Sequence, residues 1–160
     1  MLLWHTPLMK NKFLAGFVVG ALLCVVSPAQ ARNDIGHYPI SVVLDSIDAK
    51  EKLDPNIKFY FGDAKIAFET DLGVLKTNKK TNAANKSDED ACQWVFLSAL
   101  IDLQRKAAQK GANAIVEIRS NYKNKSFVSD KEFECGSGAF VAGVALVGRA
   151  VVMKAEVKTP

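Results

Sequence analysis

The segment from Ser87 to Gly111 constrains the fold most, because it carries the start, the apolar face and the end of one long helix. Ser87 can cap the first turn, and the three acids after it suit the positive end of the helix dipole. Apolar residues then recur at helical spacing, and three more widen the stripe: Trp94, Leu97 and Ile101. The basic last turn and Gly111 are typical of a helix end. The pattern predicts a helix over residues 88–110 whose first half is buried on most sides.

Segments on both sides of this helix have the composition of strands. Alternating or valine-rich apolar runs after it predict strands over 113–122, 127–135 and 138–154. Before it, the β-branched and aromatic run 57–61 and the weaker run 72–77 predict two more. Near the start of this region, residues 32–40 are expected to be an extended lead-in, and residues 41–52 one short helix.

The order of these elements predicts an α+β domain. The strands after the long helix are joined by short turns, which favours antiparallel neighbours. We therefore expect a single sheet of mainly antiparallel strands, with the long helix packed across one face and a short N-terminal helix beside it.

The N-terminus has the three parts of a secretory signal peptide. Residues 13–26 form an apolar run that is too short for a comfortable membrane span, and Lys10 and Lys12 precede it. An A-x-A pattern then ends at Ala31, where cleavage is expected. Translation from Met9 would give a leader that matches the pattern of a signal peptide better than translation from Met1 does. Cys24 would suit a lipoprotein only if a small residue preceded it, and Leu23 does not qualify.

Export leaves one domain, residues 32–160, expected in the periplasm. Its 129 residues can bury a single core. The leader takes two of the 21 basic residues and no acid, so 19 basic residues face 17 acidic ones. That balance is too weak to favour nucleic acid, and no stable membrane span is expected in the mature form.

Two cysteines, Cys92 and Cys135, stay in the mature chain, and an oxidising compartment favours a disulfide between them. A loop of this size would stabilise the fold by about 4 kcal/mol in the chain-entropy model. The bond would join the first turn of the long helix to the end of a strand. The alternative is a redox-active or metal-binding pair, but a CxxC motif is lacking and His37 is the only mature histidine.

No catalytic, cofactor or metal-binding set is predicted. His37 lies in the lead-in and is expected to be solvated or loosely packed. The acids lack a diagnostic spacing for acid–base catalysis; the candidates are Asp45, Asp48, Asp63, Glu69, Asp71 and Glu117. No GxxxxGK[ST] loop is present, and the five-residue glycine period at 138, 143 and 148 is expected to serve tight packing or bending.

The segment 78–86 is the most suggestive candidate for a binding site. It is expected to be a polar loop that is rich in amides and lysines and leads into a helix N-terminus, which can hold an anion. A plain solvated loop is the alternative, and the acids at the helix start would repel an anion. The candidate binding residues are Asn78, Lys79, Lys80, Asn82, Asn85 and Lys86.

Four stretches carry a family resemblance: KFYFG, TNKKTNAANKSDEDACQWVFLSAL, GANAIVEIRSNYKN and EFECGSGAFVAGVAL. Over residues 34–152 they resemble a family of small exported bacterial proteins often labelled "excinuclease ATPase subunit". ATP hydrolysis in DNA repair would need a phosphate loop and zinc modules, and the sequence has neither. Residues 91–119 also resemble small YbjQ-type domains and the stress-sensing lipoprotein of the Rcs phosphorelay, which implies a sensing or interaction domain.

These observations favour a non-enzymatic binding or sensing domain in envelope stress or homeostasis. Its partner is expected to be a protein or a small ligand of the cell envelope. Two alternatives stay open. A hydrolase or transferase would bring together two carboxylates from Asp63, Asp71 and Glu117, and a thiol redox protein would expose the cysteine pair.

Overall fold

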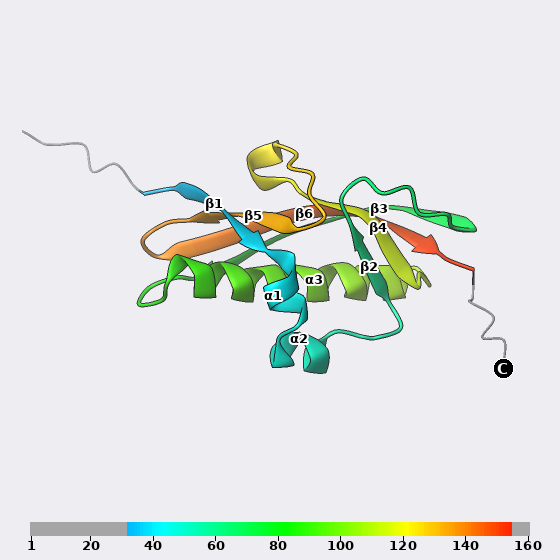
Figure 1. Ribbon diagram of the computed structural model, residues 1–160, viewed down its shortest axis with the longest axis horizontal. Helices are drawn as coiled ribbons and strands as arrows, with labels where there is room; N and C mark the ends of the chain where they lie inside the picture. Colours follow the sequence, from blue (N-terminus) through cyan, green and yellow to red (C-terminus); the bar gives the residue numbers. More distant parts are fainter. Residues whose placement is uncertain (1–31, 155–160) are drawn as a thin grey trace, which may run out of the picture.

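The computed structural model describes residues 32–154, which form a six-stranded sheet with helices against one face (Figure 1). The predicted signal peptide with Cys24, and residues 155–160, lie outside this part. In chain order the elements are β1 (Asp34–Pro39), α1 (Ile40–Leu44), α2 (Ile47–Lys52), β2 (Lys58–Phe61), β3 (Thr70–Asn82), α3 (Asp88–Gln109), β4 (Ala114–Ser120), the 3-10 turn η1 (Tyr122–Asn124), β5 (Glu132–Ser137) and β6 (Val141–Val152). None of the helices within residues 32–154 has the length and apolar character needed to cross a membrane.

The sheet is organised around β6. Strand β3 pairs with β6 over almost its whole length, while β5 and β4 pair with successive parts of its other edge, all antiparallel. Strand β1 extends the sheet beyond β5, and β2 lies parallel to β4. The predicted α+β fold, with a mainly antiparallel sheet and one long helix across it, is confirmed.

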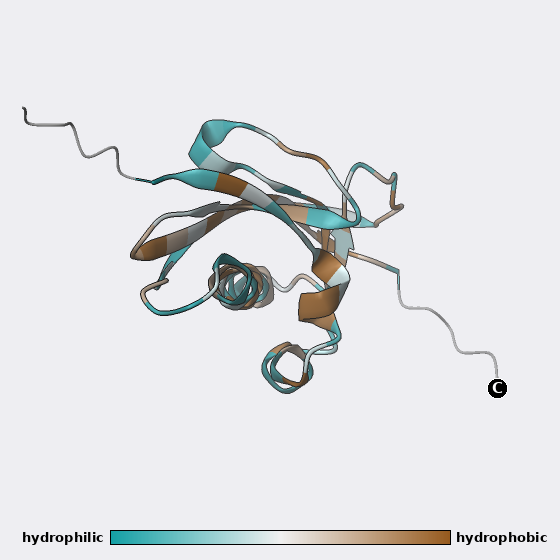
Figure 2. Cartoon of the chain, turned by 60° about the vertical axis from the view of Figure 1, so that its left-hand side comes forward, coloured by the Kyte–Doolittle hydropathy of each residue, from teal (hydrophilic) through white to brown (hydrophobic). Residues whose placement is uncertain are grey.

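Helix α3 forms the core with one face of the sheet, as Figure 2 shows nearly along the helix axis. Phe96 stacks on Phe133 of β5 with ring centroids 3.9 Å apart, and Leu100 and Leu103 are fully buried beside them. Each such side chain contributes roughly 1.5–3 kcal/mol when it leaves water. The apolar stripe predicted from the sequence therefore supplies a large part of the buried core.

The prediction of one short helix over residues 41–52 is wrong, because this segment contains two short helices, α1 and α2. Helix α1 ends at Leu44, and Ser46 then caps α2 by accepting a hydrogen bond from the Ala49 amide at 3.1 Å. A second correction concerns Trp94, which was expected to widen the buried stripe. It is 46% exposed, because α1 and α2 cover only part of that side of α3.

The face of the sheet opposite α3, here called the open face, is covered at its two ends. At one end Ile66 packs with Val116 and Val151. At the other end the Tyr122 ring lies on Gly136, where a Cβ atom would collide with it, and close to Gly143. The expected packing role of the glycine pattern holds at Gly138, where a Cβ atom would lie 2.8 Å from the Arg32 carbonyl oxygen, and at Gly148, where it would lie 2.8 Å from Ile115. At Gly143 a Cβ atom would make only ordinary van der Waals contacts.

Candidate binding surface

The segment 78–86 is not the predicted loop. Residues 78–82 form the second half of β3, because they pair in register with residues 141–145 of β6. Asn85 and Lys86 lie in the turn before α3. Alternation along the strand then divides the candidates. From Val74 to Asn82 the even-numbered residues of β3 are exposed, and the odd-numbered ones lie on the side of α3 and are less exposed.

Lys79 therefore points to the helix side, where it meets Asp102. Asp102 is 4% exposed and lies in the middle of α3. Its carboxylate accepts a 2.8 Å hydrogen bond from the Thr77 hydroxyl. The carboxylate oxygens also pair with three cations, and the N···O distances are 3.1 Å to Lys79, 2.6 Å to Arg105 and 2.7 Å to Lys106.

Burial alone would raise the pKa of Asp102, but the hydrogen bonds from Lys106, Thr77, Arg105 and Lys79 outweigh it and hold the pKa far below its usual range. The side chain is therefore an ionised anchor that joins α3 to β3. Sequence analysis missed it, although an acid within the apolar stripe of a long helix is itself a signal of a buried polar contact.

The exposed candidates share the open face with two further cations. We call Lys76, Asn78, Lys80, Asn82 and Arg119 the open-face strip. The register across β3, β6 and β4 places Val147 between Lys76 and Arg119. Within residues 32–154, no ion pair involves Lys76, Lys80 or Arg119, so three positive charges on this face are uncompensated. Lys76 and Arg119 were not among the predicted site residues, because their neighbourhood depends on strand pairing.

Beside this strip, Arg149 brings two of the candidate acids together. Its guanidinium lies 2.6 Å from a carboxylate oxygen of Asp71 and 3.4 Å from one of Glu117. A hydrogen bond from the Gly73 amide has the largest effect on the pKa of Asp71 and lowers it; burial opposes this, and the hydrogen bond and charge of Arg149 lower the pKa further. General acid catalysis needs a raised pKa in one carboxyl, so this cluster gives little support to a hydrolase. In the described part of the chain, Asp63 bonds to neither acid.

Glu117 is also unusual in its backbone. It has a φ of 54° inside a strand, at a bulge between β4 and β6. A left-handed conformation costs about 1–2 kcal/mol in a residue other than glycine. The bulge shifts the pairing register, so that Val116 pairs with Arg149 and Arg119 with Val147. It therefore determines which side chains of β4 reach the strip.

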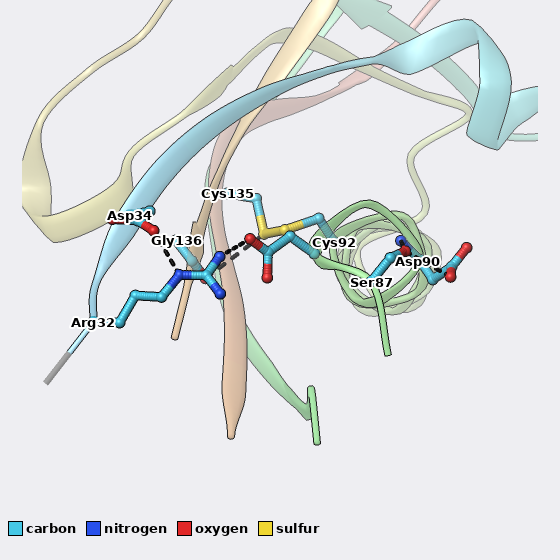
Figure 3. Close-up of polar contacts among 8 residues, drawn as sticks. Arg32, Asp34, Ser87, Asp90, Cys92, Cys135 and Gly136 are labelled. Carbon is cyan, nitrogen blue, oxygen red and sulfur yellow. Dashed lines mark hydrogen bonds and ion pairs between the residues drawn. A yellow bond between two sulfur atoms is a disulfide. The ribbon is translucent and has the colours of Figure 1, made fainter. Parts of the chain in front are cut away.

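The two cysteines form the predicted disulfide, which joins the first turn of α3 to β5 (Figure 3). Their Cα atoms are 5.9 Å apart, and both residues are fully buried. A redox-active pair needs an accessible sulfur, so this burial favours a structural bond.

The start of α3 is closed to an anion. The Ser87 hydroxyl accepts a hydrogen bond from the Asp90 amide at 3.0 Å. Arg32 pairs with Asp34, as Figure 3 shows, and also with Asp88. The N-terminus of α3 is thus already capped, and the carboxylates of its first turn would repel an incoming anion.

His37 is a partly exposed residue of β1. Its ring packs against Phe127 at 4.4 Å between centroids, and Nε2 lies 3.8 Å from a Glu134 oxygen. Among residues 32–154, no group of three or more metal-ligating side chains is close enough to hold an ion. The structure thus gives His37 packing partners and assigns it no ligand role.

Comparison with known proteins finds no family model that matches the chain, and no curated protein or solved structure that is significantly similar to it.

Proposed function

We propose that this chain is a non-enzymatic binding domain of the cell envelope, and that its open-face strip receives an acidic segment of a partner protein. The observation that carries the proposal is the set of three cations on one sheet face, Lys76, Lys80 and Arg119, which have no ion pair with any described residue. Lysine and arginine can pair with carboxylates, and the amides of Asn78 and Asn82 can donate to them.

The electrostatic surroundings support an acidic partner. The nearest acids, Asp71 and Glu117, are engaged with Arg149. An incoming carboxylate would therefore meet uncompensated positive charge, and such charge mainly raises the rate of encounter and sets specificity. Binding at this face should weaken as salt rises, because most of these side chains are exposed.

The periplasm remains the proposed location. The leader-like N-terminus and the disulfide support export, because disulfides persist in oxidising compartments. A role in envelope stress or homeostasis is proposed from the resemblance of residues 91–119 to small sensing domains.

Photo-crosslinking in cells tests the proposal. A photoreactive amino acid replaces Asn78 in the full-length exported protein, and in a control protein it replaces Gln109, which is exposed at the end of α3. We expect a discrete adduct from position 78 and none of the same mass from position 109. Equal adducts from both positions, or none from position 78 in a folded and exported protein, would contradict the proposal.

A further inference from the structure

A second exposed surface lies on the helical side of the molecule. Trp94 of α3 and Val42 of α1 line a shallow hollow of about 130 Å³, and they are 46% and 47% exposed. Ile47, at the start of α2 and next to the lining residue Asp48, is 76% exposed. We call Val42, Ile47 and Trp94 the Trp94 surface. Exposed tryptophan on a shallow hollow is typical of the centre of a protein interface.

Acidic residues border the Trp94 surface. Asp48 and Asp90 line the hollow, and the segments that carry the surface, residues 45–54 and 88–94, contain seven acids and two lysines, although Asp88 is paired with Arg32. Lys52 pairs with Asp48 and lies 5.6 Å from the Trp94 ring centre. The surface is therefore an apolar centre with an acidic surround, which suits a partner that is basic and partly apolar.

The opposite side of the same molecule has that character. The open-face strip carries three cations, Lys76, Lys80 and Arg119, and within residues 32–154 no ion pair involves them. Apolar side chains flank the open-face strip along the sheet, with Val74 of β3 52% exposed and Val141 of β6 49% exposed. Val141 pairs in register with Asn82, at one end of the strip.

We propose that the partner of the open-face strip is the Trp94 surface of a second copy of this chain. This inference rests on the proposed function and names the acidic partner. Figure 1 shows α1, α2 and α3 on one side of the sheet, so the two surfaces face opposite directions. A contact between two different surfaces is heterologous and leaves each copy with one free surface, which leads to open chains or rings.

Sedimentation analysis of the folded, disulfide-bonded mature protein tests this. Raising its concentration from about 20 µM to about 1 mM in low salt should increase the average mass at least about twofold, by mass action. High salt, about 0.5 M, should reverse the increase because it screens the charges. A protein that stays monomeric over this range, or stops at a closed dimer, overturns the inference.

Complementary variants make the test specific. Trp94→Arg removes one surface, and Lys76→Glu with Arg119→Glu removes the other. Each variant alone should be monomeric, while an equal mixture should form a one-to-one heterodimer and nothing larger. Lys131→Glu, at an exposed position in the loop before β5 that belongs to neither surface, has the same charge change as Lys76→Glu and should still assemble. A mixture that stays monomeric, with both variants folded by circular dichroism, overturns the heterologous contact.

The outcome separates the two proposals. If position 78 crosslinks to a different protein while the chain stays monomeric, the strip is a binding surface and the self-assembly inference is wrong. If position 78 gives no adduct at a concentration at which the wild type assembles, the contact does not use the strip, and both proposals fail.

Discussion

Replacing Asp102 with asparagine tests the anchor between α3 and β3. The change keeps the size of the side chain and one acceptor for the Thr77 hydroxyl, but it removes the charge that faces three cations. A hydrogen bond to a charged group is worth about 1.5–3 kcal/mol when buried. The three cations have side chains 36–64% exposed, so water can solvate them again in the variant. We therefore expect Asp102→Asn to lower the free energy of unfolding by about 2–3 kcal/mol at pH 7.

The loss of stability in Asp102→Asn should depend on pH in a defined direction. The pKa of Asp102 is far below its usual range in the folded protein, while an unfolded aspartate titrates near pH 3.9. The stabilisation is therefore fully present above that pH and falls as the pH drops towards the folded pKa. Below about pH 3.9, the difference between wild type and variant should shrink by about 1.4 kcal/mol per pH unit.

Urea unfolding of both proteins from pH 7 to pH 3 measures this difference. The exposed Asp45→Asn variant is the control and should stay within about 0.5 kcal/mol of wild type. Equal stability of Asp102→Asn and wild type at pH 7 would refute the anchor. So would a difference that does not change as the pH falls to 3.

Three further predictions concern stability. Replacing Cys92 and Cys135 with serine should lower the free energy of unfolding by about 2–4 kcal/mol. When the folded wild type is treated with mild reductant and an alkylating reagent, mass spectrometry should find no labelled thiol. Rapid labelling would contradict the burial of the two cysteines. Gly136→Ala should cost about 1–3 kcal/mol in urea unfolding because the Tyr122 ring occupies the space; adding it to Tyr122→Ala should cost nothing more. Glu117→Gly should be more stable than Glu117→Ala by about 1 kcal/mol in thermal unfolding, because only glycine adopts a φ of 54° without strain; equal stability would contradict this.

Local signals in the sequence predicted α3 well, because its cap, apolar stripe and end lie within one segment. The disulfide was also predicted from the sequence, since the expected loss of the leader would leave only Cys92 and Cys135. The extension of β3 through residues 78–82 could not be predicted locally. Its polar composition resembles a loop, and only the pairing with β6 and the contact between Lys79 and Asp102 make it a strand.

The candidate site was predicted only in part for the same reason. Asn78 and Lys80 lie on an exposed surface, as a binding role needs, but Lys79 is turned to the helix. Arg119 joins them from β4, 39 positions further along the chain than Lys80, and no sequence spacing indicates that approach.

The most direct test of the central claim is the yield of the crosslink from position 78 in three backgrounds. The account predicts a strong adduct in the wild type, a loss of at least about tenfold in Lys76→Glu/Arg119→Glu, as for a change of about 1.4 kcal/mol, and no loss in Lys131→Glu. An adduct that persists in the double variant, while that protein is folded and exported, would contradict the claim that the open-face strip binds an acidic partner.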